Sequence, residues 1–334
     1  MTTNQLRRNS TLLVQAATIL SLSALIMPAQ SQAQSAAGAY PTKPIRIVLP
    51  FAGGNALVGR WLAQYLPPVL GQQVLADVRL GAGGNIGHEA VAKSAPDGYT
   101  LLMGAPPVVI NPNLSPGLSY DTLRDFTPIA LLATIPNMIT VHPSVPAKTL
   151  KELIQLARSN PDKIAYGSGG VGSTNHLAAE LLKTITKTRI LHVPYKGASI
   201  ALTGALSGEV DMVILVASSA SSFIKDGRMR AIAILDTKRV GSMPQVPTSA
   251  EAGMPQLVAV NWYVLLAPAG TPRAIIERLN AESVKIMRTP ETREFFASLG
   301  GEPASGTPEQ SAAFLREEYE RWGKVIRAAG IKAE

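Results

Sequence analysis

A repeated order of short apolar run, glycine-rich loop and helical pattern constrains the fold of this 334-residue chain most strongly. The runs at 45–49, 74–78 and 101–103 open a first series, and a second series of the same kind occupies 164–235. Near-continuous apolar runs are typical of strands buried on both faces, and parallel strands need helical crossovers between them. The sequence therefore predicts an α/β fold with parallel βαβ units.

Two separate βαβ series predict two lobes. The first series ends before Pro143 and Pro146, and a late strand at 262–267 with helices after Pro272 is free to return to it. We expect residues 34–142 and 260–334 to form lobe 1, residues 143–259 to form lobe 2, and two crossovers to join them. Ligands bind at the carboxyl ends of strands in such sheets, so a central cleft is the expected site.

The N-terminus has the order of a secretory signal peptide. Arg7 and Arg8 precede an apolar run from Thr11 to Met27, and small and polar residues follow around Ala33. A membrane anchor is the alternative, but polar residues within the run and Pro28 after it disfavour an anchor. We expect residues 1–33 to be removed and the mature protein to be periplasmic.

Composition excludes several classes of function. The chain has no cysteine, which rules out disulfides, thiolate metal sites and a cysteine nucleophile. Its formal charge of +8 is scattered rather than gathered into a basic stripe, and aromatic residues make up only 5%. We therefore expect no nucleic-acid partner.

Three glycine-rich loops carry the predicted binding chemistry, at 51–55, 81–87 and 167–174. Glycine lets a ligand approach the backbone, and the free N–H groups of a helix N-terminus favour an anion. Hydroxyls in the third loop add donors, although Ser173 or Thr174 could instead be an ordinary N-cap. Two interpretations stay open for His176: it lines the cleft, or it caps its helix and packs against the protein. The predicted ligand-binding residues in these loops are Phe51, Gly53, Gly54, Asn55, Gly83, Gly84, Asn85, Ser168, Gly170, Gly172, Ser173, Thr174 and His176.

No catalytic or metal constellation stands out. Gly167, Gly169 and Gly172 match G-x-G-x-x-G, but the next strand ends without an acidic residue to hold a ribose. No P-loop lysine and no G-x-S-x-G elbow is present. The four histidines lack metal-ligand spacing. We expect no cofactor, no metal and no enzymatic activity.

An ordered set of motifs resembles one receptor family. The motifs lie at 40–51, 81–87, 96–102, 120–126, 166–177, 192–197, 246–253 and 266–272. Together they resemble the Bug receptors, the extracytoplasmic substrate-binding proteins of tripartite tricarboxylate transporters. The resemblance implies a periplasmic-binding-protein type 2 fold, a small-carboxylate ligand held by backbone N–H groups and waters at the glycine loops, and transient contact with integral-membrane transporter subunits. We expect a monomer.

Three departures from the family pattern concern the ligand. Ala56 stands where an aspartate would align, 105–108 replaces a polar stretch, and 214–216 replaces a frequent Phe-Asp-Asn segment. A buried polar ligand group left unpaired costs about 1–3 kcal/mol. We therefore expect an acid with an apolar or aromatic body, with Ala105 and Leu215 in the apolar wall. The alternatives are an orphan receptor that signals through a membrane sensor, or an enzyme that uses the same cleft.

Overall fold

A computed structural model describes residues 40–332, and the predicted signal peptide lies outside them. Contacts divide the chain after Tyr40, and the residues from Pro41 onward form one unit. The first part of that unit contains β1 (Ile45–Leu49), α3 (Gly54–Tyr65), α4 (Pro67–Leu70), β2 (Val74–Val78), the 3₁₀ turn η1 (Ala82–Gly84), α5 (Asn85–Ala92), β3 (Thr100–Gly104), α6 (Pro107–Leu114), α7 (Thr122–Asp125) and β4 (Phe126–Val141).

The remaining elements begin with a second βαβ series and end in helices. They are α8 (Leu150–Ser159), β5 (Ala165–Ser168), α9 (Thr174–Thr186), β6 (Leu191–Pro194), α10 (Ala198–Ser207), β7 (Met212–Val216), α11 (Ala217–Lys225), β8 (Arg230–Ile234), β9 (Val260–Pro268), α12 (Arg273–Met287), α13 (Pro290–Ser298), β10 (Glu302–Pro303) and α14 (Pro308–Ala329).

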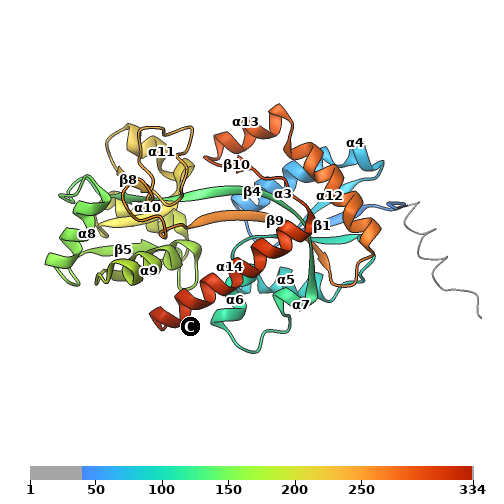
Figure 1. Ribbon diagram of the computed structural model, residues 1–334, viewed down its shortest axis with the longest axis horizontal. Helices are drawn as coiled ribbons and strands as arrows, with labels where there is room; N and C mark the ends of the chain where they lie inside the picture. Colours follow the sequence, from blue (N-terminus) through green and yellow to red (C-terminus); the bar gives the residue numbers. More distant parts are fainter. Residues whose placement is uncertain (1–39, 333–334) are drawn as a thin grey trace, which may run out of the picture. The chain divides into compact units, whose positions relative to one another are not determined.

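One mixed sheet connects all ten described strands, in the order β2-β1-β3-β9-β4-β7-β5-β6 with β8 and β10 paired to β4. Strand β1 pairs in parallel with β2 and β3, and β5 pairs in parallel with β6 and β7. The expected parallel βαβ units are confirmed. Strands β4 and β9 run between the two groups of elements (Figure 1).

Strand β4 was not expected from the sequence. Its residues from Phe126 to Pro136 pair with β9, and those from Asn137 to Val141 pair with β7 and β8. Its two prolines stand where the pairing is irregular: Pro128 beside a register shift, and Pro136 next to the change of partners. A proline has no N–H to donate to a ladder, so these are positions where a strand tolerates it.

The directions of the strands bring the loops of both series to the same region of the sheet. Because β3 is antiparallel to β9 and β9 is antiparallel to β4, strands β1–β3 run in the direction of β4. Strand β7 is antiparallel to β4, so β5–β7 run the opposite way. The carboxyl ends of both groups therefore point toward the middle of β4, around Pro136 and Asn137. We call this region the junction.

Strands β4 and β9 run between the two groups, and we call them the crossing strands. Hydrogen bonds join them at the junction. The backbone N–H of Asn137 donates to the carbonyl of Ala259 at 3.0 Å, and its side-chain Nδ2 donates to the same carbonyl at 3.1 Å. Asn261 Nδ2 donates to Asn137 Oδ1 at 3.1 Å. Strand β4 is paired on both sides of this point, with β9 up to Pro136 and with β7 from Asn137. The expected lobe limits at residues 142 and 259 stay a prediction.

Candidate functional site

The three glycine loops predicted from sequence all follow strands whose carboxyl ends face the junction. The first follows β1, the second follows β2, and the third follows β5. Each loop leads into a helix, namely α3, α5 and α9, so each ends at a helix N-terminus. These N-termini leave backbone N–H groups without helical partners, and they form the candidate site.

The first loop is shaped by two glycines and a buried asparagine. Gly53 has φ +64° at the N-cap of α3 and provides no side-chain cap. A Cβ on Gly54 would lie 2.3 Å from the hydroxyl oxygen of Tyr263. Asn55 is 3% exposed, and its Nδ2 donates to the carbonyl of Met103 at the end of β3 at 2.9 Å. The loop is thus anchored to the neighbouring strand.

The second loop is held by two residues that sequence reasoning missed. Asn111 Nδ2 donates to the carbonyl of Gly83 and to Asn85 Oδ1, both at 2.8 Å. The hydroxyl of Tyr120 also donates to Asn85 Oδ1 at 2.8 Å. The Asn85 side chain is therefore used within the protein, although it was predicted to bind ligand.

Phe51 joins the first loop to the second. Gly84 has φ +91° and ψ −9°, and a Cβ there would lie 2.3 Å from Phe51 Cζ. The ring of Phe51 also meets that of His88 edge-on, with centroids 6.0 Å apart. Only glycine fits at position 84, because both the backbone angle and the space exclude a side chain.

The substitution Gly84→Ala tests this close packing. We expect the free energy of unfolding to fall by about 2–3 kcal/mol, since left-handed strain and a clash with Phe51 add together. Urea unfolding measures the effect. Gly71→Ala is the matched control, because Gly71 has φ +72° but nothing within 4 Å of its Cβ position. An equal loss in both variants would show that the Phe51 contact contributes nothing.

The third loop uses its own donors to hold its shape. Gly170 N–H donates to Ser168 Oγ at 3.1 Å, and Gly172 N–H donates to His176 Nδ1 at 3.1 Å. Ser173 is the N-cap of α9, one of the two residues expected as an ordinary N-cap. Its Oγ donates to the carbonyl of Gly170 at 2.6 Å. Of the N–H groups expected to bind a carboxylate, those of Gly170 and Gly172 are thus already paired. Within residues 40–332, the backbone N–H groups of Thr174 and Asn175 have no hydrogen-bond partner.

His176 packs behind this loop. It is 4% exposed, and its ring stacks on that of His192 with centroids 4.2 Å apart. Burial, followed by the neighbouring His192, lowers the pKa of His176 to about 4. Because Nδ1 accepts from Gly172, the proton of the neutral ring is on Nε2. The geometry favours the capping and packing role over a cleft-lining one.

A serine–histidine contact lies at the start of the same loop. Ser168 Oγ is 2.6 Å from His192 Nε2, because β5 and β6 are paired side by side. Ser168 is fully buried and also accepts from Gly170. A buried hydroxyl tied into the loop is an anchor, and this position does not suit a nucleophile.

The two predicted apolar-wall residues lie in different surroundings. Ala105 is buried directly after β3, ahead of α6. Leu215 lies on β7, where it packs in a core cluster with Ala201, Ala205, Val213 and Met229. Their contact with a ligand stays a prediction.

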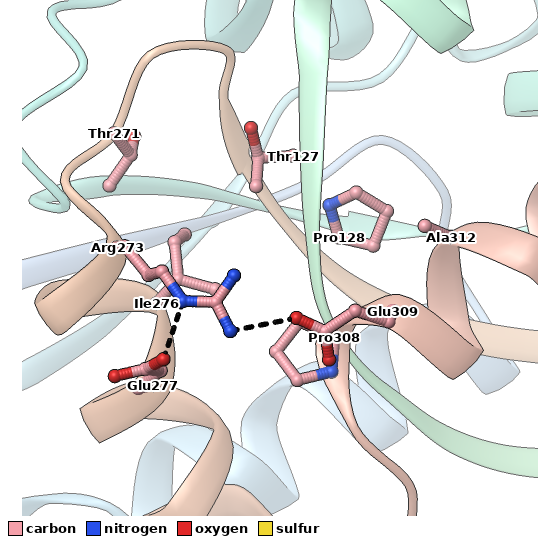
Figure 2. Close-up of a pocket in the computed structure, with 9 residues that line it drawn as sticks. All are labelled: Thr127, Pro128, Thr271, Arg273, Ile276, Glu277, Pro308, Glu309 and Ala312. Atoms are coloured by element: carbon pink, nitrogen blue, oxygen red, sulfur yellow. Dashed lines mark hydrogen bonds and ion pairs between the residues drawn. The ribbon is translucent and has the colours of Figure 1, made fainter.

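Pockets in the described part of the chain also lie away from the glycine loops, and two of them border strand β4. The first, of about 260 Å³, is formed by β4, α12 and α14. Figure 2 shows Arg273 between Glu277 and Glu309, to which it donates at 2.7 Å and 3.0 Å. Arg273 thus links α12 to the start of α14 through an ion pair. The second, of about 850 Å³, is lined by Thr134, Pro136 and Val260 of the crossing strands, with the loop at 236–242.

Comparisons with known proteins decide the family. The profile of the tripartite tricarboxylate transporter family receptor matches residues 58–331. The chain belongs to this family. The relatives include protein BugT of Bordetella pertussis, which is 36% identical over 300 residues and covers 89% of this chain and 92% of BugT. A protein from the tcbD-tcbE intergenic region of Pseudomonas sp. is 38% identical over 306 residues, covering 91% of each chain.

Solved structures agree with this membership in the receptor family. An R. palustris protein solved with adipate has a TM-score of 0.78 and 34% identity, covering 88% of this chain and 99% of its own. MatC of Rhodopseudomonas palustris, solved with bound malate, has a TM-score of 0.74 and 31% identity, covering 86% and 100%. The periplasmic binding protein BugD also has a TM-score of 0.74, at 30% identity. The protein has the fold of a periplasmic receptor of the tripartite tricarboxylate type, as the resemblance implied.

Two further observations concern residues 40–332. No helix in this part of the chain is long and apolar enough to cross a membrane. Nor does it contain a group of three or more His, Asp or Glu side chains arranged to hold a metal ion.

Proposed function

We propose that this receptor is exported to the periplasm, where it binds a small carboxylate with an apolar body and delivers it to a tripartite transporter. One observation carries the proposal: strand direction turns the N-termini of α3, α5 and α9 toward the same junction. Such N-termini attract anions through free N–H groups and the helix dipole. None of the three helices has an acidic residue in its first turn.

The apolar body of the ligand is proposed from the residues around these N-termini. Ala56 lies in the first turn of α3, and Ala105 precedes α6; both are buried. Two relatives were solved with ligands, one with adipate, whose centre is a chain of methylenes, and one with malate, whose centre carries a hydroxyl. The apolar residues of this chain suit the first kind of acid better. In this proposal the acid is bound without turnover, the protein acts as a monomer, and residues 1–33 are removed on export.

Isothermal titration calorimetry against six acids tests the proposal: adipate, benzoate, succinate, malate, aspartate and glutamate. We expect adipate or benzoate to bind most tightly, because an unpaired ammonium or hydroxyl group costs about 1–3 kcal/mol, which is about 5- to 150-fold in affinity. Tightest binding to aspartate or glutamate would contradict the apolar body. No binding to any of the six would contradict carboxylate capture itself.

A further inference from the structure

The hydroxyl of Tyr263 lies against the N-terminus of α3. Tyr263 belongs to β9 and is 8% exposed, and its hydroxyl makes no hydrogen bond to another side chain or carbonyl within residues 40–332. A Cβ on Gly54 would lie 2.3 Å from the hydroxyl oxygen and 3.4 Å from Cζ. The hydroxyl is thus directed onto the first residue of the helix, and glycine at position 54 makes room for it.

The position of Tyr263 is fixed by the central sheet. Successive side chains of a strand point to opposite faces. Trp262, the preceding residue, faces α14 and donates from Nε1 to Glu318 at 2.8 Å. Tyr263 therefore points to the other face, toward α3, and β9 is held between β3 and β4. A hydroxyl placed by a central strand is a rigid donor, and rigidity favours specific recognition.

The N-terminus of α3 is otherwise uncapped. Gly53 supplies no side-chain cap, and the first turn of this 12-residue helix contains no acidic residue. The first N–H groups and the positive end of the dipole are therefore available to an anion. Beside them lies a phenol whose side chain is more than nine-tenths buried and whose hydroxyl is unpaired and directed at Gly54, and this second, independent feature fits a ligand acceptor.

We propose that Tyr263 is a specificity-determining residue that donates a hydrogen bond from its hydroxyl to a ligand carboxylate held at the N-terminus of α3. This inference rests on the proposed function. It adds to the glycine loops a residue from a strand far along the chain. Burial raises the pKa of Tyr263 to about 12, so the hydroxyl keeps its proton as a donor at neutral pH.

Tyr263→Phe tests the inference, because it removes the hydroxyl and keeps the ring. We expect the Kd for the tightest-binding acid among adipate, benzoate, succinate, malate, aspartate and glutamate to rise about ten- to one-hundred-fold, as for other hydrogen bonds to a charged group. The melting temperature should stay near that of the wild type. Tyr65→Phe is the matched control: Tyr65 lies at the opposite end of α3, stacked on Trp61. Its affinity should equal that of the wild type.

Gly54→Ala gives a second measurement at the same place. Its methyl group would occupy the space of the Tyr263 hydroxyl, so we expect weaker binding although position 263 is unchanged. Wild-type affinity in Tyr263→Phe would overturn this inference and leave carboxylate binding intact. Failure of the wild-type protein to bind any of the six acids would instead overturn the proposed function, and this inference with it.

Discussion

Glu318→Ala is expected to lower the free energy of unfolding by about 3–5 kcal/mol, because two buried indole N–H groups lose their acceptor, at about 1–3 kcal/mol each, and a partly exposed guanidinium loses its partner. Glu318 is 6% exposed on α14 and accepts three hydrogen bonds. Its Oε2 accepts from Nε1 of Trp262 at 2.8 Å and from Nε1 of Trp322 at 3.0 Å. Its Oε1 accepts from Nε of Arg321 at 2.9 Å. Alanine would leave these donors without an acceptor in the interior.

The loss should also loosen the region around the junction. Helix α14 packs against β4, α6 and α9, which come from both βαβ series. Arg321 additionally donates to the carbonyl of Val258, next to the start of β9. Removing the carboxylate therefore breaks its hydrogen bond to Trp262 of β9 as well as those to Arg321 and Trp322 within α14.

Urea unfolding followed by tryptophan fluorescence measures the effect, since two of the three tryptophans contact Glu318. Glu317→Ala is the control on the same helix: Glu317 is exposed, and its substitution should change stability by about 0.5 kcal/mol or less. Glu318→Gln keeps one acceptor oxygen and should fall between the two. A loss below about 1 kcal/mol in Glu318→Ala would show that the three donors find other acceptors.

Local patterns predicted the strand–loop–helix units because those units are encoded by neighbouring residues. The loops after β1, β2 and β5 were found from their glycines and lie where expected. Strand β4 was missed for a physical reason. Most of its residues are buried, which removes the alternation of a half-buried strand, and Pro128 and Pro136 normally interrupt one.

The candidate site shows the same limit. The sequence located the glycine loops but could not show which N–H groups are free. The side chains of Ser168 and His176 accept hydrogen bonds from two of these N–H groups, and both contacts depend on the folded shape of the loop. Asn111, Tyr120 and Tyr263 reach the loops from distant parts of the chain, and nothing in the local sequence marks their side chains for that role.

Acidification from pH 7.5 to pH 5 is expected to lower the free energy of unfolding by about 4 kcal/mol through His88 and His176, about 2 kcal/mol for each. Burial lowers the pKa of His88 to about 3. His88 Nδ1 is 2.9 Å from the Tyr120 hydroxyl, whose proton goes to Asn85, so Nδ1 is the donor. Nε2 is buried without a partner, and a proton there would have no acceptor.

His176 resists protonation for a related reason. A proton on Nδ1 would face the N–H of Gly172, which now donates to that atom. His192 and Lys183 also oppose a positive charge at this position, and the carboxylate of Glu180, 4.0 Å from Nε2, only partly offsets them. Protonation would therefore break the third glycine loop as well as place a charge in the interior.

The direction follows from proton uptake. Both folded-state pKa values lie below 6.5, so the unfolded chain binds more protons as the pH falls from about 6.5 toward 4 for His176 and toward 3 for His88. The stabilisation is complete above pH 6.5 and is lost across that window. Carboxylates titrate mainly below about pH 4.5, so the interval from 7.5 to 5 reports chiefly on histidines.

Urea unfolding at pH 7.5, 6 and 5 provides the measurement. His88→Asn and His176→Asn should each be less stable than the wild type at pH 7.5, because each loses buried contacts. Each should nevertheless lose only about half as much stability between pH 7.5 and pH 5, because one protonation site is gone. A pH dependence as steep in both variants as in the wild type would show that neither histidine is held neutral by the fold.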